Sequence, residues 1–258
     1  MCFSNEGGGA DVRHPGWMGR GDGAMIGPVD LGFDFGAVSD LGVGRANNED
    51  SAYCSGAVLA VADGVGGGPA GEVASAIAVG ALRGLEGHVD RSDDLRPALH
   101  ERVAIARARL DSAARGDHSV AGMATTLTAV LMGRSGKRHG RYGAEVGLVH
   151  VGDSRLYVSL GGQLFQLTRD HSLPQLLVDR GQLSATEAEN HPQRSMIVRS
   201  LQAGAHDDVD LVLLLLLEGQ RLLLCATDCR TTSKRRASAS CSCRELHRKR
   251  QKSCLTRH

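Results

Sequence analysis

The chain has 258 residues, enough for one large domain or two small ones, with 41% hydrophobic residues and a net charge of +1. Residues 229–258 hold ten Lys and Arg residues and one acid, which leaves 20 basic and 28 acidic residues in the rest. An acidic body of this kind is not typical of a nucleic-acid binder. No apolar run approaches the roughly 20 residues of a membrane helix, so we expect neither nucleic acid nor a membrane as a partner.

Cysteine usage and the start of the chain bear on the compartment. Four of the seven cysteines lie in residues 229–258, and the remainder holds only Cys2, Cys54 and Cys225, so no disulfide framework is predicted. No pattern of a signal peptide opens the chain. We therefore expect a cytoplasmic protein. We also expect it to act as a monomer.

The first half of the chain shows three short strand patterns and two helical ones. Residues 1–33 are glycine-rich, lack periodicity and predict a flexible leader. Strands are predicted at about 35–40, 48–54 and 57–62, with turn residues between them. Helical spacing of apolar residues then predicts helices over the ranges 70–86 and 94–115.

The second half is dominated by strand patterns. Residues 122–133 are rich in threonine and aliphatics and predict a strand, followed by a polar turn over 134–141. We expect 146–151 and 156–158 to pair as a hairpin around the turn at 152–155. The remaining predictions are a strand at 163–167, helical structure over 173–189, and strands at 209–217 and 221–226. Runs of strands with grouped helices favour an α+β fold of antiparallel sheets covered by helices.

The apolar periodicity stops abruptly after Asp228. We predict a domain over residues 34–228 and interpret residues 229–258, crowded with Arg, Lys, Ser and Cys, as an out-of-frame ending. A disordered basic tail is the simpler alternative for the same residues.

One stretch organises the predicted chemistry. The apolar run Ala57–Ala62 ends at Asp63, which is followed by Gly64, by further glycines and by a helix start at Pro69. A carboxylate at the end of a buried strand, beside bare backbone, suits a hard metal ion that prefers oxygen ligands. Asp50 is a second acid thirteen residues earlier, so the two segments together predict a metal-dependent phosphohydrolase.

Six segments between residues 35 and 228 match one family in order. They are Ser39–Ser51, Ala62–Gly67, Gly122–Thr126, Val151–Arg155, Leu167–Ser172 and Arg180–Leu201. In these segments the chain resembles the bacterial PPM-type protein serine/threonine phosphatases, the metal-dependent type 2C class. The resemblance implies two packed antiparallel β-sheets flanked by helices, an α-β-β-α sandwich, whose closing C-terminal strands are missing from this sequence.

The resemblance also implies a reaction. Two Mn²⁺ or Mg²⁺ ions between the sheets would activate a water for hydrolysis of phosphoserine or phosphothreonine in proteins, opposing a bacterial Ser/Thr kinase. By motif, Asp63 would bridge both ions and Gly64 would lend its carbonyl. Asp50 would bind one ion, directly or through water, with Glu49 in support.

Three further residues take roles by the same resemblance. Asp228 would be another metal ligand, Asp153 would help hold a third, weaker ion, and Arg45 would bind the substrate phosphate with its planar guanidinium. Asp153 could instead simply fasten the tip of a hairpin. His171 is interpreted as a packing or hydrogen-bonding residue rather than a ligand.

The chain departs from the family pattern near its end. Cys229 and Arg230 follow Asp228 where the family has glycine and an apolar residue, and the later Asp-Asn element has no counterpart. We therefore expect weak or no turnover and poor solubility. A catalytically impaired module that binds phosphoproteins, or a truncated product without function, are the alternatives. Val65 and Gly68 stand where many relatives have methionine or histidine, which leaves the general acid open.

Overall fold

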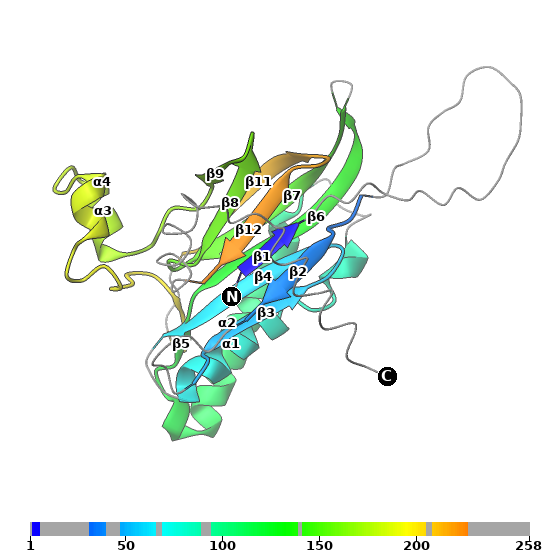
Figure 1. Ribbon diagram of the computed structural model, residues 1–258. Coiled ribbons are helices and arrows are strands. Elements are labelled where there is room, and N and C mark those ends of the chain that lie inside the picture. Colours follow the sequence, from blue (N-terminus) through cyan, green and yellow to red (C-terminus); the bar gives the residue numbers. More distant parts are fainter. Residues whose placement is uncertain are drawn as a thin grey trace, which may run out of the picture.

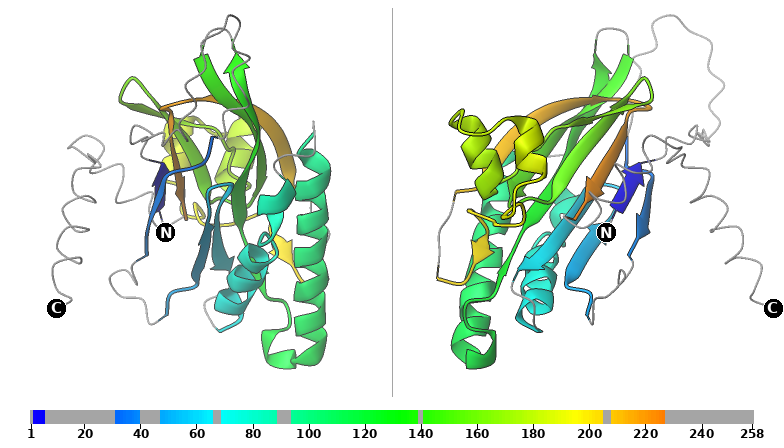
Figure 2. Two further views of the ribbon diagram at one scale, coloured as in Figure 1. Left: turned by 90° about the vertical axis from the view of Figure 1, so that its right-hand side faces the viewer. Right: turned by 60° about the vertical axis from the view of Figure 1, so that its left-hand side comes forward.

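The computed structural model describes residues 2–5, 31–39, 47–65, 69–88, 94–138, 141–204 and 208–226. These residues form two antiparallel sheets packed face to face, with two long helices against the outer face of the larger sheet (Figure 1 and Figure 2). The predicted α+β class with two packed antiparallel sheets is confirmed. Arg45, Asp228 and the predicted tail at 229–258 lie outside the described residues.

The larger sheet has seven strands in the order β10-β5-β4-β6-β7-β11, with β3 paired to β4. Its strands are β3 (Asp50–Cys54), β4 (Val58–Val65), β5 (Ala124–Thr125), β6 (Leu127–Arg138), β7 (Arg141–Val151), β10 (Leu201–Gln202) and β11 (Asp210–Leu217). The smaller sheet has five strands in the order β2-β1-β12-β8-β9. They are β2 (Phe35–Val38), β1 (Cys2–Asn5), β12 (Arg221–Cys225), β8 (Arg155–Leu160) and β9 (Gln163–Gln166).

The helices fall into two groups. The long helices α1 (Pro69–Gly80) and α2 (Arg96–Gly116), with short 3₁₀ turns at Leu85–His88 and His118–Val120, lie beside the larger sheet. Two short helices, α3 (Leu173–Asp179) and α4 (Ala185–Glu189), stand away from both sheets (Figure 1). We call residues 173–200, which contain α3 and α4, the covering segment. No helix in the described ranges is long and apolar enough to cross a membrane.

Strand β4 shows how the sequence builds two cores. Because side chains alternate across a strand, Val58, Ala60 and Ala62 face the helices, and Leu59 and Val61 face the other sheet. The helix-side core continues through Leu99, Val103 and Leu110 of α2. The core between the sheets continues through buried residues of β6, β7, β8 and β12: Val130, Met132, Val146, Leu148, Leu156, Val158, Leu222 and Leu224.

Two glycines let α2 approach the larger sheet closely. A Cβ at Gly133 or at Gly147 would lie 2.7 Å from a methyl carbon of Leu95 or Leu99, respectively. A side chain at either of these strand positions would therefore force the leucine side chain, or the start of α2 with it, to shift.

The structure corrects two of the predicted turns. Residues 134–138 continue β6 and pair with the start of β7, so the predicted polar turn at 134–141 is wrong over most of its length. The predicted hairpin of 146–151 with 156–158 is also wrong, because β7 pairs with β6 and β11, whereas β8 pairs with β12 and β9. The turn at 152–154 instead carries the chain from one sheet to the other.

Two other predictions hold only in part. Cys2–Asn5, inside the predicted flexible leader, pairs with both β2 and β12, and Phe33 is buried in the core between the sheets. The predicted helical stretch 173–189 is divided into α3 and α4, because Gly181 takes a left-handed conformation (φ +68°) that interrupts a helix. Ser184 then begins α4 with a capping box to Glu187.

Candidate functional site

Asp50 and Asp63 are direct partners across the β3–β4 pair. Paired residues of antiparallel strands point to the same face, with Cβ atoms about 4.5–5.5 Å apart. Leu59 and Val61 precede Asp63 on its face of β4, and Ala52 and Cys54 follow Asp50 on its face of β3; all four belong to the core between the sheets. The two carboxylates therefore share the inner face of the larger sheet where this core ends, and both are half-buried.

Thr125 and Thr126 fix the backbone of Asp63. The Asp63 N–H donates to the Thr126 hydroxyl (2.9 Å), and the Asp63 carbonyl accepts from the Thr126 N–H (2.9 Å) and the Thr125 hydroxyl (3.0 Å). Both threonine side chains are fully buried. These bonds hold Asp63 between the pairing of β4 with β6, which ends at Val61, and the pairing of β4 with β5, which begins at Gly64.

The backbone around Gly64 lies directly against α1. A Cβ at Gly64 would lie 2.3 Å from the Gly71 carbonyl oxygen, and a Cβ at Gly71 would lie 2.8 Å from Oε2 of Glu49. The Gly64 N–H donates to the Glu49 carbonyl (3.1 Å). Gly64 and Gly71 therefore bring the end of β4, the first turn of α1 and the Glu49 carboxylate into one place, where the positive end of the helix favours an acid.

Asp153 lies in the turn that joins the two sheets. Gly152 has a left-handed conformation (φ +99°), and a Cβ there would lie 2.5 Å from Cγ2 of Thr126, so only glycine fits. The Asp153 side chain is buried, with 1% exposure. The hydroxyls of Thr126 and Ser154 are 2.6 Å apart, so one threonine links the Asp63 backbone to the residue after Asp153.

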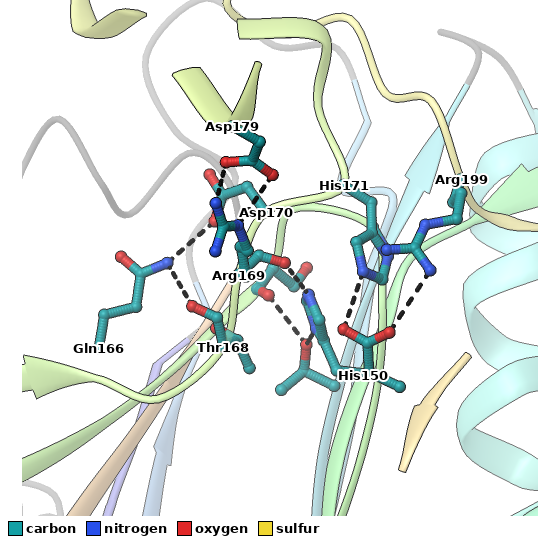
Figure 3. Close-up of polar contacts among 12 residues, drawn as sticks. His150, Gln166, Thr168, Arg169, Asp170, His171, Asp179 and Arg199 are labelled. Atoms are coloured by element: carbon teal, nitrogen blue, oxygen red, sulfur yellow. Dashed lines mark hydrogen bonds and ion pairs between the residues drawn. The ribbon is translucent and has the colours of Figure 1, made fainter. Parts of the chain in front are cut away.

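His171 anchors the same turn. The Gly152 N–H donates to Nδ1 of His171 (3.1 Å), and the His171 N–H donates to the Gly152 carbonyl (2.8 Å). Since Nδ1 accepts, the ring proton is on Nε2 and is donated to Asp210 (3.1 Å), whose other oxygen lies 3.4 Å from Arg199 (Figure 3). Burial and the charge of Arg199 lower the pKa of His171, with Asp210 opposing, which agrees with a neutral ring.

His150 lies beside His171, with ring centroids 4.8 Å apart. Its Nδ1 is 2.9 Å from the Thr128 hydroxyl, and its Nε2 is 3.0 Å from the Arg169 carbonyl. Burial, then the neighbouring His171, lowers the pKa of His150 to about 4. His150 is therefore neutral at physiological pH and donates from Nε2 to the carbonyl.

Arg155 and Asp170 form a buried ion pair close to this network. The guanidinium donates through Nε and Nη2 to the two carboxylate oxygens at 2.7 and 2.6 Å, and through Nη1 to Tyr157 (3.0 Å). Burial alone would lower the pKa of Arg155, but the bonds to Asp170 outweigh it and raise that pKa. The pair fastens the start of β8 to the segment that leads to His171.

The predicted site residues meet in part. The structure brings Glu49, Asp50, Asp63 and Gly64 together, and the Thr126–Ser154 contact ties the Asp153 turn to them. No group of three or more His, Cys, Asp or Glu side chains that could hold a metal occurs among the described residues. The carboxylates of Asp50 and Asp63 on one face of the sheet, together with the backbone carbonyl of Gly64, are nevertheless oxygen donors of the kind that Mn²⁺ and Mg²⁺ prefer.

Sequence reasoning missed His150 and Asp210. His150 is a polar residue in the otherwise apolar end of β7, and Asp210 directly precedes a run of apolar residues in β11. An isolated polar residue beside a buried apolar run was the available signal. The interpretation of His171 as a hydrogen-bonding residue agrees with its contacts.

The comparisons with known proteins agree with this geometry. The family model for protein phosphatase 2C matches residues 45–214. The serine/threonine protein phosphatase PstP of Mycobacterium tuberculosis is 40% identical over 198 residues, which cover 77% of this chain and 36% of PstP. The serine/threonine phosphatase stp of Listeria welshimeri is 31% identical over 196 residues, covering 73% of this chain and 74% of stp.

A solved structure shows the same fold. The crystal structure of the catalytic domain of PstP in complex with two manganese ions is 37% identical and aligns with a TM-score of 0.59, over 72% of this chain and 74% of that one. The present chain thus spans about a third of the full length of the mycobacterial PstP sequence that it matches. On the family match and these relatives, the chain belongs to the protein phosphatase 2C family.

Proposed function

We propose that the chain is a metal-dependent protein phosphatase that hydrolyses phosphoserine and phosphothreonine in phosphorylated proteins. The observation that carries the proposal is the direct pairing of Asp50 with Asp63, inside the region that matches the family. Relatives named serine/threonine phosphatases, one of them solved with two manganese ions, support it.

The described residues suit a divalent cation. Asp50 and Asp63 would supply carboxylate oxygens, Gly64 its carbonyl, and Asp153 would serve a third, weaker site. When bound, a pair of Mn²⁺ or Mg²⁺ ions supplies Lewis acidity for the hydrolysis of a phosphate ester. The chain's own part is to hold these oxygens in place through Thr126 and through the close contact of Gly64 with Gly71.

Arg45 and Asp228 belong to the same proposal on the resemblance alone. Arg45 is the first residue of the family match and would bind the substrate phosphate, a task that suits a planar guanidinium. Asp228 would add a further carboxylate. We also propose that the opposing enzyme is a bacterial Ser/Thr kinase and that the chain acts as a cytoplasmic monomer.

The test is a Mn²⁺ titration by calorimetry, combined with phosphate release from a phosphothreonine peptide. We expect Mn²⁺ binding and weak, metal-dependent release, because the sequence after Asp228 departs from the family. Asp63→Asn should remove both signals, and Glu101→Gln, on the exposed face of α2, should leave both in place. Mn²⁺ binding without any release would overturn the hydrolase proposal, and the absence of Mn²⁺ binding would overturn the metal site as well.

A further inference from the structure

We propose that His171 is a positioning residue that couples the Gly152–Asp153 turn to the covering segment, residues 173–200. The importance of Asp153 for metal binding rests on the proposed function, but the coupling itself rests only on the contacts of His171. Those contacts join three parts of the chain that are distant in sequence: the turn between the sheets, the start of β11 and the end of the covering segment.

His171 forms two hydrogen bonds to one residue, Gly152. His171 satisfies both backbone groups of Gly152, with its own N–H at 2.8 Å from the carbonyl and its Nδ1 at 3.1 Å from the N–H. Gly152 has a left-handed backbone conformation, and the Thr126 side chain leaves no room for a Cβ at this position, so only glycine fits. The turn that carries Asp153 is therefore held in one shape from two sides, by Thr126 and by His171.

The end of the covering segment is attached to the backbone of His171. The start of the segment runs beside residues near its end, because the Leu173 N–H donates to the Met196 carbonyl (2.8 Å) and the preceding Ser172 forms a bridge with Ile197. The Val198 N–H then donates to the His171 carbonyl (2.8 Å). The backbone of His171 thus holds the returning end of the covering segment while its side chain holds the turn.

The third part is Asp210 at the start of β11. One of its oxygens accepts from Nε2 of His171 (3.1 Å), and the other lies 3.4 Å from Arg199 of the covering segment (Figure 3). The carboxylate closes a loop of contacts that runs from Gly152 through the imidazole to Arg199. A shift of the covering segment would therefore be transmitted to the turn through His171, which is 3% exposed.

The chemistry of the position selects a neutral imidazole. The ring must accept a hydrogen bond at one nitrogen and donate one at the opposite nitrogen, as neutral histidine can. Lysine and arginine have no acceptor, and leucine fills similar space with neither group. His171→Leu thus removes both side-chain bonds, and Asp210→Asn keeps an acceptor for Nε2 where Asp210→Ala removes it.

The experiment is amide hydrogen exchange by NMR on the full chain. In His171→Leu and in Asp210→Ala we expect exchange at Gly152, Asp153 and Val198 to be faster by at least about tenfold, the effect of one lost hydrogen bond. Asp210→Asn should restore protection to within a few-fold of the wild type. The control is Tyr53→Phe on β3, which removes the hydrogen bond from Tyr53 to Glu86, away from the turn, and should leave these three amides unchanged.

Two outcomes would overturn the coupling. One is uniform acceleration across the amides of β6 and β7, which is what a general loss of stability produces. The other is an unchanged Gly152 in both His171→Leu and Asp210→Ala. If His171→Leu does not fold, the comparison of Asp210→Ala with Asp210→Asn decides the question.

A Mn²⁺ titration adds a second measurement. Under the proposed function, His171→Leu weakens the weakest Mn²⁺ site by about tenfold or more and spares the tighter sites, a size typical of removing a supporting residue around a metal. Loss of all sites together would contradict a role confined to the Asp153 turn. If the wild-type chain binds no Mn²⁺, the proposed function fails, and the exchange data still decide the coupling.

Discussion

Asp50 in β3 lies directly opposite Asp63 in β4, so two acidic side chains from separate motifs share one face of one sheet. Like charges directly opposite each other destabilise a pair of strands. The arrangement becomes favourable when a cation lies between the carboxylates, and this gives the first prediction.

Asp63→Asn keeps the size of the side chain and removes its charge. We expect the affinity for Mn²⁺ to fall by more than about 100-fold, because substitutions around a metal cost up to about that much in the outer shell and Asp63 is proposed as a direct ligand. We also expect the metal-free variant to be as stable as the wild type or slightly more stable, because one of two facing charges is gone. Calorimetry and urea unfolding without metal measure the two effects, and an unchanged Mn²⁺ affinity would contradict the assignment of Asp63.

Gly64→Ala tests the close approach of β4 to α1. Its new methyl group would lie 2.3 Å from the Gly71 carbonyl oxygen, so the start of α1 must move. We expect the free energy of unfolding to fall by about 1–3 kcal/mol, as for other overpacked sites. Gly80→Ala, at the end of α1 where a Cβ meets nothing within 4 Å, is the control and should cost nothing.

Arg155→Met tests the buried ion pair with Asp170. The variant leaves the Asp170 carboxylate, whose side chain is 4% exposed, without the guanidinium. Removing one member of a buried pair costs about 3–5 kcal/mol. The matched control is Arg169→Met, which breaks an exposed pair with Asp179 and should cost less than about 1 kcal/mol. Equal losses in the two variants would show that burial of the Arg155 pair contributes little.

The stability of the fold should depend on pH through His150. Burial lowers its pKa from 6.5 to about 4 in the folded chain. Above pH 6.5 the ring is neutral in both folded and unfolded states. As the pH falls from 6.5 to 4, only the unfolded state gains the proton, so the free energy of unfolding falls, by about 3 kcal/mol in all.

The measurement is urea unfolding at several pH values between 6.5 and 4 for the wild type and for His150→Gln. The variant should lose less stability over this range, whatever its stability at pH 7, because the carboxylates and His171 titrate in both proteins. Parallel curves would show that His150 does not supply the dependence.

The exposed apolar side chains of strand β11 predict a tendency to aggregate. It is the last strand of the larger sheet among the described residues, and Val212, Leu213 and Leu215 are 38–49% exposed. Apolar edge strands promote association. Leu215→Lys should lower the aggregated fraction several-fold in light scattering at matched concentration, since a lysine on an edge opposes pairing. Leu160→Lys removes another exposed leucine, on β8, and should have a smaller effect if the edge is responsible.

Much of the fold could be predicted because its signals are local. Val58–Ala62 alternates between two cores, and the apolar spacing of α2 marks one buried face. The sequence pattern also placed Asp50 near Asp63, since their strands follow each other and are joined by a short connection.

The rest depended on contacts between distant segments. The turn at Gly152 has the composition of a hairpin turn, and only the partners of β7 and β8 show that these strands belong to different sheets. The network of His150, His171 and Asp210 joins residues that are 19 to 39 positions apart in its main bonds. Strand β1 could not be predicted from its own residues, because its pairing with β12 joins the two ends of the described chain.

The chain crosses from one sheet to the other between β7 and β8, which links the proposed metal site to the packing between the sheets. Asp153 stands in the turn that joins the two sheets, and the contact between the Thr126 and Ser154 hydroxyls (2.6 Å) ties this turn to the Asp63 backbone only while the sheets remain packed together. A slight separation of the two sheets, too small to unfold either one, would already break this contact. We therefore expect the affinity for divalent ions to fall when the packing between the sheets first loosens, before global unfolding is detected.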